Sequence, residues 1–460
     1  MLGIRETKKE FGHLINTEQS FRPRGKTFCQ NIRDVVKNDL CTGCATCISL
    51  CPEEAIELTK DEGEGIYVPV ILEKKCNDCG ICYRVCPGQK VDFKQLNFEI
   101  FGKESGDLLI GNYLNCYIGH AIDYEIRYNS ASGGLVTQLL IFALEEGIID
   151  GALVTRMKKD SPLEPDPFIA RTREEIIEAS KSKYCPVPAN IALKKILNSN
   201  EGEKFAVVGL PCHIHGIRKA ECINKKLKEK IVLHLSLFCN HTPTFLATEF
   251  LLKKANVKKE KVKRIYYRGE GWPGRTKIEL ENSNLLLPSS WKFVGSYFFT
   301  PLRCFLCSDG VGELSDLSFA DAWLPEFTED KIGNSIIISR SESGEKLLQL
   351  LESRKEVDLA KISAKKVIQS FQRMLSFKKL NIEARIRLFN KDIKYDNTSK
   401  SNYLDFFLAL FPFVSVKLSK NAFIRYFMLY LPFQTSWVFN LPYIVVFSIK
   451  SKIYRSSSDT

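Results

Sequence analysis

The sequence predicts a small α+β module followed by an α/β domain, with an apolar extension at the C-terminal end. Three observations lead to this prediction. Two cysteine runs of identical spacing lie within residues 41–87, strand-like and helix-like segments alternate from about residue 130 to 260, and residues 401–460 become apolar and basic. With 460 residues, of which 44% are hydrophobic and 26% charged, the chain is long enough to bury a core.

The two cysteine runs, CTGCATCISLCP and CNDCGICYRVCP, share the spacing C-x2-C-x2-C-x3-C-P and predict a dicluster ferredoxin module. In this bacterial-type motif, the fourth cysteine of each run ligates the cluster of the other run. Gly43, Ala45 and Gly80 are small, which lets the loops close around a cluster. Two zinc sites are the alternative, although zinc usually takes paired C-x2-C motifs. The expected ligands are Cys41, Cys44, Cys47 and Cys86 for one 4Fe-4S cluster, and Cys76, Cys79, Cys82 and Cys51 for the other.

The N-terminal stretch MLGIRETKKEFGHL has no apolar run of signal-peptide length, so we expect a cytoplasmic protein. In that reducing compartment the 16 cysteines are not expected to form disulfides. The net charge of +12 raises the question of nucleic acid, but the basic runs at 224–230 and 253–264 contain glutamates and no interleaved aromatic residues. We therefore expect solvated basic surfaces and no nucleic-acid partner. Such surfaces could attract an acidic redox protein.

Residues 130–155 predict a turn, a helix and a strand. Ser132 is expected as the N-cap, Gly133 and Gly134 open the turn, and apolar residues at helical spacing continue until Gly147 ends the helix. The segment GALVT, residues 151–155, predicts a buried strand. Backbone N–H groups before a helix can hold the phosphates of a cofactor. A serine followed by glycines is, however, also an ordinary helix start.

Two further strands are expected to end at cysteines. KFAVVGLPC ends at Cys212 and KIVLHLSLFC ends at Cys239, with helices predicted over about 214–220 and from about residue 244. Ligands of open α/β sheets bind at the carboxyl ends of strands, so both cysteines are candidates for a site.

Cys304 and Cys307 add a C-x2-C pair to these two cysteines. The four thiols could hold a third 4Fe-4S cluster or a zinc ion, or could be a dithiol beside two buried thiols. The remaining cysteines are expected to be ordinary buried or partly buried thiols: Cys29, Cys116, Cys185 and Cys222.

Residues 341–400 are polar and predict a helical region, after which the composition changes. Residues 426–449 carry no charge, and basic residues flank them on both sides. Pro432 and Pro442 disfavour a regular transmembrane helix. An aromatic-rich apolar stretch with basic flanks suits an interfacial anchor at the inner face of the membrane. The alternative is a segment that covers the domain or contacts a partner subunit.

The chain resembles the coenzyme F420 hydrogenase/dehydrogenase beta subunit family, in the form with an N-terminal dicluster ferredoxin module. The matching segments run in the family's order from about residue 120 to 325: IRYNSASGGLVTQLL, SKYCPVPAN, VVGLPCHIHGIRK, SLFCNHTPT, GWPG and RCFLCSDGVGELSDLSFADAW. The resemblance implies an iron-sulfur flavoprotein with FAD in an α/β flavin-binding catalytic domain. It also implies a third 4Fe-4S cluster on Cys212, Cys239, Cys304 and Cys307, and a flavin near Ser132, Gly133, Gly134, Lys183 and Tyr184.

The sequence departs from the family pattern at two positions. Ala131 replaces the first of two serines that commonly precede the glycine pair, and His213 stands where glutamine is frequent. The first change removes a hydroxyl contact, and the second alters hydrogen bonding beside Cys212. Three histidines near the cysteine motifs could transfer protons or be structural, and three aspartates could contact a cofactor or anchor loops. They are His213, His215, His241, Asp309, Asp316 and Asp321.

The expected function is that of an oxidoreductase. Clusters pass single electrons whereas an organic coenzyme takes a hydride, so a flavin is needed between them. The expected partners are a ferredoxin-like or other redox protein and coenzyme F420 or another hydride-accepting organic substrate. The alternative is a non-catalytic electron-transfer subunit of a larger redox complex.

The expected domain boundaries are 1–35 for an N-terminal segment, 36–95 for the ferredoxin-type module, 110–340 for the FAD and iron-sulfur domain, 341–400 for a helical region and 401–460 for the apolar tail.

Overall fold

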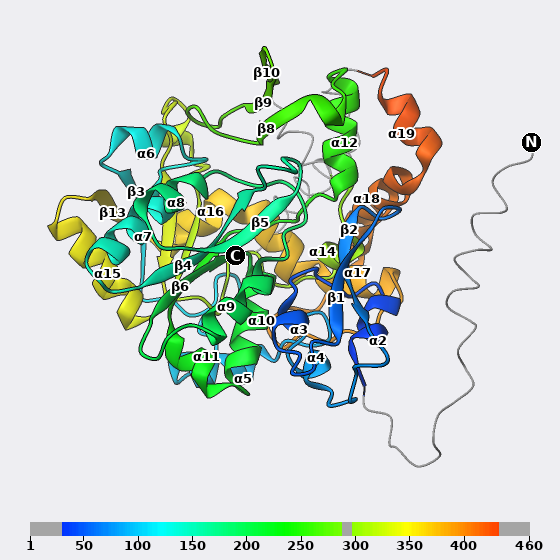
Figure 1. Ribbon diagram of the computed structural model, residues 1–460, viewed down its shortest axis with the longest axis horizontal. Coiled ribbons are helices and arrows are strands. Elements are labelled where there is room, and N and C mark those ends of the chain that lie inside the picture. Colours follow the sequence, from blue (N-terminus) through cyan, green and yellow to red (C-terminus); the bar gives the residue numbers. More distant parts are fainter. Residues whose placement is uncertain (1–29, 288–296, 432–460) are drawn as a thin grey trace, which may run out of the picture.

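The computed structural model describes residues 30–287 and 297–431, and Figure 1 shows the mixed α/β fold that they form. Residues 1–29, 288–296 and 432–460 lie outside the described residues. The expected thiol Cys29 and most of the expected C-terminal anchor therefore also lie outside them.

The two cysteine runs fold into a compact module with a matching backbone in each half. Each run passes through two residues with left-handed backbone angles, at φ 68° and 65° for Gly43 and Ala45 and at φ 56° and 70° for Asp78 and Gly80. A short helix follows each turn, and an antiparallel hairpin separates the two runs. The elements of the module are α2 (Ile32–Lys37), α3 (Thr46–Ser49), β1 (Ile56–Asp61), β2 (Ile66–Ile71) and α4 (Ile81–Arg84).

The rest of the chain is organised around a mixed sheet. Among the described residues, this sheet has eight strands in the order β13-β3-β12-β11-β7-β6-β4-β5. The central strands β11, β7, β6 and β4 run parallel, and the strands on either side pair antiparallel. The α/β fold expected for this part of the chain is thus confirmed. Its strands are β3 (Asn115–Ala121), β4 (Gly151–Met157), β5 (Pro165–Ala170), β6 (Phe205–Gly209), β7 (Ile231–Leu237), β11 (Leu317–Asp321), β12 (Ser335–Ser339) and β13 (Val357–Ile362).

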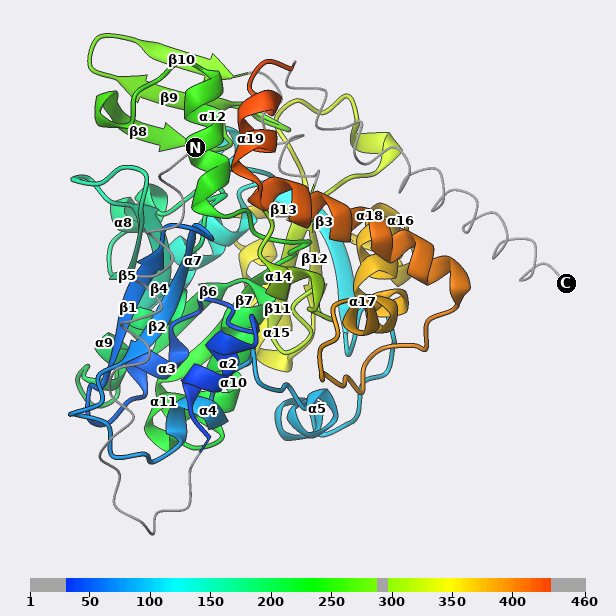
Figure 2. The same ribbon diagram turned by 90° about the vertical axis from the view of Figure 1, so that its right-hand side faces the viewer.

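Helices cover both faces of this sheet. On one face, α7 (Leu135–Glu145), α8 (Arg173–Glu178) and α15 (Glu342–Ser353) bury apolar side chains against the strands. On the other face lie α5 (Phe93–Phe101), α9 (Leu193–Leu197), α10 (Pro211–Glu221) and α11 (Lys225–Lys230). Leu50 and Val85 of the cysteine module belong to this second core. The module therefore packs against the α10 side of the sheet, as Figure 2 shows.

Smaller elements complete the described chain. A three-stranded sheet of β8 (Val262–Tyr266), β9 (Thr276–Leu280) and β10 (Asn284–Leu287) packs with α12 (Phe245–Lys254). The C-terminal part is helical, with α16 (Ala364–Leu375), the π-helix η4 (Ser376–Leu380), α17 (Ile382–Leu388), α18 (Tyr403–Lys420) and α19 (Ala422–Met428). The short α6 (Tyr124–Tyr128), η1 (Ala189–Ala192), η2 (Lys259–Lys261), α14 (Leu302–Phe305) and η3 (Pro325–Phe327) connect these elements.

Three local predictions need correction. Ser132 is not the N-cap of α7, because Gly134 holds that position with a left-handed φ of 77°, and the Ser132 hydroxyl donates to the carbonyl of Asn334 at 2.8 Å. Helix α10 begins at Pro211, so Cys212 lies in its first turn and not in a loop. The polar segment 341–400 contains strand β13, whose polar side chains suit an edge strand of the sheet.

Asn190 connects the cysteine module to the α/β domain. Its buried side-chain amide donates to the Thr46 hydroxyl at 2.8 Å and to the His213 carbonyl at 2.9 Å. Its backbone N–H donates to the carbonyl of Cys44 at 3.0 Å. One residue thus joins the first cysteine loop to α10, which carries Cys212.

We expect Asn190→Ala to lower the free energy of unfolding by about 2 kcal/mol, because two buried hydrogen bonds are lost and the Thr46 hydroxyl is left without its donor. Thermal unfolding of the protein purified without oxygen measures this loss. The control Asn38→Ala removes an exposed amide that bonds only within its own turn, and should leave the unfolding temperature unchanged. Equal unfolding temperatures for all three proteins would contradict the assigned role of Asn190.

Candidate functional site

Four cysteines line one cavity in the ferredoxin-type module. Cys41, Cys44, Cys47 and Cys86 share its wall with apolar side chains that include Ile32 and Leu58. Burial and the neighbouring thiols raise the pKa of Cys41 and of Cys47, and burial raises the pKa of Cys86 to about 11. The fourth cysteine of the second run therefore lies with the first three of the first run. We call these four residues the first tetrad.

The second tetrad comprises Cys76, Cys79, Cys82 and Cys51. Burial raises the pKa of Cys82, and the neighbouring Cys79 and Cys76 add to this increase. Cys51 and Cys76 belong to the same apolar cluster as Cys82. Cys79 is exposed, so this tetrad reaches the protein surface. The interaction of Cys47 with Cys82 places the two tetrads next to each other.

The third tetrad gathers Cys212, Cys239, Cys304 and Cys307 at the carboxyl edge of the sheet. Cys212 interacts with the other three, and burial raises its pKa well above the usual range. Cys212 also interacts with Cys44 of the first tetrad. The four cysteines predicted from three separate segments are thus brought together.

The cysteine tetrads could hold either zinc ions or 4Fe-4S clusters. The described residues contain no group of three or more His, Cys, Asp or Glu side chains arranged to hold one metal ion. A 4Fe-4S cluster binds one cysteine at each of its four irons, so each tetrad supplies the number of thiols that one cluster needs. Thiols with raised pKa values release their protons when iron binds.

The other cysteines differ in exposure. Cys116 and Cys185 are buried, as expected. Cys222 is exposed, which corrects the prediction that it is at least partly buried. It is the C-cap residue of α10, and its thiol donates to the Glu99 carboxylate at 3.0 Å.

Buried or partly buried cations flank the tetrads. Arg303 donates to the carbonyls of Pro87 and Leu306 at 3.2 and 2.6 Å, and interacts with Cys41, Cys86 and Cys307. It therefore stands between the first and third tetrads. The ammonium of Lys219 donates to the Cys86 carbonyl at 2.6 Å.

A third cation, Lys378 of η4, lies beside the third tetrad. Burial raises the pKa of Cys239 to about 12, and Lys378 acts in the opposite direction. Buried thiolates are costly unless positive charge accompanies them, so these cations suit sites that become anionic on loading. Arg303, Lys219 and Lys378 were not among the residues expected from the sequence. Arg303 and Lys219 are signalled only by their proximity to Cys304 and Cys212, whereas Lys378 lies 71 positions after Cys307 and has no such signal.

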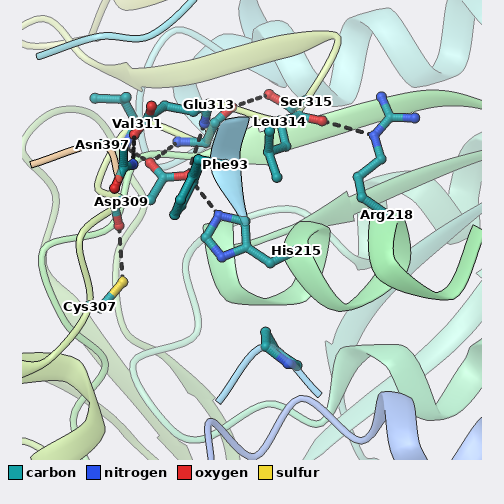
Figure 3. A network of polar contacts seen from close by, with 12 residues as sticks. Phe93, His215, Arg218, Cys307, Asp309, Val311, Glu313, Leu314, Ser315 and Asn397 are labelled. Atoms are coloured by element: carbon teal, nitrogen blue, oxygen red, sulfur yellow. Dashed lines mark hydrogen bonds and ion pairs between the residues drawn. The ribbon is translucent and has the colours of Figure 1, made fainter. Parts of the chain in front are cut away.

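A carboxylate organises the loop that follows Cys307. The Asp309 carboxylate accepts hydrogen bonds from the N–H groups of Val311, Gly312 and Glu313 at 2.8 to 2.9 Å. Its other contact is the imidazole of His215, at 2.9 Å, as Figure 3 shows. Burial opposes ionisation of Asp309, yet these hydrogen bonds hold its pKa well below the usual range. The pair ties the loop of Cys307 to the helix of Cys212.

The remaining titratable candidates are held by protein contacts. His213 accepts from the Leu210 N–H at 3.1 Å and contacts the Val187 carbonyl at 3.0 Å, and burial lowers its pKa to about 4. A neutral ring with both nitrogens in use is unsuited to proton delivery. The ring of His241 packs against Tyr297, with 4.9 Å between centroids. Asp316 contacts His234 and Arg218 and therefore anchors a loop.

The residues expected near a flavin occupy a second part of the same edge. The Gly133 N–H donates to the Ser335 hydroxyl at 3.0 Å, and a Cβ on Gly133 would lie 2.7 Å from the Gly119 carbonyl. The Lys183 ammonium donates to three carbonyls at the end of α8, and burial lowers its pKa to about 7. The polar groups of Ser132, Gly133 and Lys183 are thus used within the protein. They form a scaffold and do not offer free donors to a phosphate.

Arg268, which the sequence reasoning missed, connects the expected flavin residues. Its guanidinium donates to the Ala131 carbonyl at 2.6 Å, to the Asp321 carboxylate at 2.8 Å and to the Tyr184 hydroxyl at 3.4 Å. The indole of Trp272 donates to the same carboxylate at 2.9 Å. The turn at Ser132 and the Tyr184 loop are therefore held around one ion pair. The position of Arg268 just before the GWPG segment is the only hint in the sequence.

Aromatic rings border this ion pair. Trp323 is 38% exposed, and its ring lies 4.6 Å from that of Trp272 between centroids. Asp321 ends β11, which runs parallel to β7, the strand that leads to Cys239. The aromatic border and the third tetrad therefore lie along the same edge of the sheet. A planar ring could stack there.

In a comparison with known protein families, segments of the chain match three family models. They are a 4Fe-4S dicluster domain over residues 40–90, and the coenzyme F420 hydrogenase/dehydrogenase beta subunit N-terminal and C-terminal regions over residues 116–194 and 202–365. The chain is 28% identical over 284 residues to the coenzyme F420 hydrogenase subunit beta of Methanosarcina barkeri, which covers 59% of this chain and 94% of the relative. Identity to the subunit of that name in Methanothermobacter thermautotrophicus is 30% over 248 residues, covering 53% and 82%.

Two other similarities extend the comparison. The chain is 26% identical over 348 residues to the coenzyme F420-dependent sulfite reductase of Methanocaldococcus jannaschii, covering 72% of this chain and 49% of the relative. Among solved structures, a chain of the xenon-derivatized F420-reducing NiFe hydrogenase complex from Methanosarcina barkeri matches with a TM-score of 0.49 and 22% identity. That match covers 63% of this chain and 98% of the solved chain.

We expect Arg303→Met to lower the midpoint potential of a neighbouring cluster by about 60 mV, a tenfold change for one electron, because a buried positive charge favours the reduced form. A redox titration followed by electron paramagnetic resonance measures this shift. Arg303→Lys keeps the charge and should move the potential less. Equal shifts in both variants, with unchanged iron content, would show that packing and not charge is responsible.

Proposed function

Because the chain belongs to the coenzyme F420 hydrogenase/dehydrogenase beta subunit family, we propose that it is an iron-sulfur flavoprotein oxidoreductase that exchanges electrons between a redox protein and an organic hydride acceptor. The observation that carries this proposal is the continuity of the three cysteine tetrads. The exposed Cys79 belongs to the second tetrad, Cys82 and Cys47 join the second to the first, and Cys44 and Cys212 join the first to the third.

The twelve cysteines of the tetrads are the proposed ligands of three 4Fe-4S clusters. Clusters, when bound, each carry one electron at a time, and a bound FAD can exchange both single electrons and hydride. The protein contributes burial of the sulfur atoms and nearby N–H donors. The Gly43 N–H lies 3.4 Å from the Cys41 sulfur, and the Ala55 N–H lies 3.3 Å from the Cys51 sulfur. Such hydrogen bonds to sulfur raise the potential of an iron-sulfur centre.

The proposed FAD and substrate region is the edge around Arg268 and Trp323. Its support is the aromatic border, the ion pair of Arg268 with Asp321, and the N-terminus of α7, whose first N–H groups have no partner within the helix. Ser132, Gly133, Gly134 and Lys183 would keep these parts in place, and the Tyr184 ring would lie nearest the ligand. Relatives are named for coenzyme F420, so this deazaflavin is the first hydride acceptor to test.

The redox partner is proposed to bind at the exposed Cys79. We infer a cytoplasmic location, which keeps the thiols reduced before iron is inserted and is compatible with contact to the inner leaflet of the membrane. The second candidate function is a non-catalytic electron-transfer subunit of a larger complex. The observation that favours it is that two relatives covered over most of their length are named as hydrogenase subunits.

Iron content tests the third cluster. We expect about twelve irons per chain in the protein purified without oxygen, and about eight in the double variant Cys239→Ser with Cys304→Ser. Iron and acid-labile sulfide assays give both values. Cys222→Ser replaces an exposed thiol outside the tetrads and should retain the full iron content. About eight irons in the unaltered protein would refute a third cluster.

Trp323→Ala tests the substrate region. We expect bound flavin in the unaltered protein, and in the variant a KM for coenzyme F420 raised about tenfold with unchanged iron content, because a stacking surface is lost. Tyr113→Ala, which removes another partly exposed aromatic ring, is the control and should not change KM. Turnover without any flavin would contradict the flavoprotein proposal. Flavin without turnover would favour the electron-transfer subunit.

A further inference from the structure

The two C-terminal helices expose a continuous set of apolar side chains. On α18, Tyr403, Phe407, Leu410 and Val414 recur every three or four residues and therefore share one side of the helix. Their exposed fractions are 89%, 59%, 42% and 47%. The set continues on and just after α19 with Phe423, Tyr426, Phe427 and Tyr430, which are 57% to 77% exposed. We call these eight residues the C-terminal apolar face.

The opposite side of both helices is firmly packed. Leu408 and Val416 of α18 belong to a buried cluster with Phe305 and Phe377. Met428 of α19 packs in a cluster with residues of α12, and the Lys254 ammonium donates to its carbonyl at 3.1 Å. Single exposed apolar residues are common, but a contiguous set on fixed helices marks a binding surface.

Charge identifies what kind of surface the face would meet. Residues 406–458 contain no Asp or Glu but six Lys and Arg residues, which are Lys417, Lys420, Arg425, Lys450, Lys452 and Arg455. The nearest acid before this stretch, Asp405, is buried in the capping box of α18. Among the described residues, Lys417 and Lys420 of α18 and Arg425 of α19 lie on the same two helices as this face, and Lys420 also pairs with Glu64 of the ferredoxin-type module. A face of Phe, Tyr and aliphatic side chains on helices that carry these cations is complementary to anionic headgroups above an apolar layer.

We propose that the C-terminal apolar face binds the surface of an anionic lipid bilayer. The helices would lie on the membrane and not cross it. No single helix among the described residues has both the length and the apolar character of a membrane span. Helices α18 and α19 have this length and apolar character only when they are taken together, and the pair is bent by 94°. One side of α18 must also stay against the protein, where Ser415 and Ser419 are buried.

This mode of binding would orient the electron-transfer centre. Phe305, which packs under α18, lies between Cys304 and Cys307, and Phe377 precedes Lys378. The third tetrad therefore lies directly behind the helices that would meet the bilayer. The inference does not require the proposed reaction, since it rests on the exposed side chains and the charge pattern alone.

Flotation of the full-length holoprotein with lipid vesicles tests the proposal. We expect the protein to float with vesicles of phosphatidylcholine containing 30% phosphatidylglycerol, and to bind pure phosphatidylcholine at least tenfold less. Binding should weaken as salt rises, because the headgroup attraction is screened. The variant with Tyr403→Ser, Phe407→Ser, Phe423→Ser and Phe427→Ser should lose at least tenfold in vesicle affinity.

A matched control separates this face from exposed apolar residues in general. Phe98→Ser with Tyr124→Ser removes two rings of similar exposure on α5 and α6 and should leave vesicle binding unchanged. Iron content and unfolding temperature establish that both variants are folded. Undiminished vesicle binding by the four-residue variant would overturn the proposal. Absence of vesicle binding, with a dimer in light scattering that the variant abolishes, would overturn it in favour of a second copy of the chain.

Discussion

The cost of burying thiolates is the constraint on which the rest of the structure depends. Eleven of the twelve tetrad cysteines are at least partly buried, and burial raises the pKa of eight of them, so the protein alone does not favour bare thiolates there. Such sites become stable only when a metal takes the place of the protons. The buried Arg303 and Lys378 and the partly buried Lys219 then offset the charge that remains. Each of them also hydrogen-bonds to a main-chain carbonyl near a cysteine, so charge compensation and loop geometry are coupled.

This coupling explains how two parts of different architecture act as one unit. The first cysteine loop touches the α/β domain through Cys44, whose carbonyl accepts from Asn190 while its thiol interacts with Cys212. Gly216 of α10 lies so close to this loop that a Cβ would be 2.3 Å from the Thr46 hydroxyl. The absence of a side chain at this one helical position lets the module approach the helix of Cys212. Close contact of the first and third tetrads follows from that approach.

The sequence predicted those features that depend on local spacing. The repeated C-x2-C spacing requires left-handed turns, which lie at Gly43 and Gly80. The apolar runs before Cys212 and Cys239 form the parallel strands β6 and β7. Features that depend on distant contacts escaped it. Arg268 meets Ala131 across 137 positions, and Arg303 meets Pro87 across 216. Strand β13 escaped because an edge strand can keep polar side chains in solvent, so this strand did not stand out within a polar segment.

The failure at Ser132 shows how tertiary structure overrides a local motif. A serine before a glycine pair suits an N-cap, but the hydroxyl here reaches Asn334 beyond β11, and the left-handed Gly134 starts the helix instead. Gly133 can lie this close to the sheet only because it has no side chain. A Cβ at this position would clash with the Gly119 carbonyl. The glycine pair therefore sets the distance between α7 and strands β3 and β12. Any ligand held at this edge would depend on that distance, even where the glycines do not contact it.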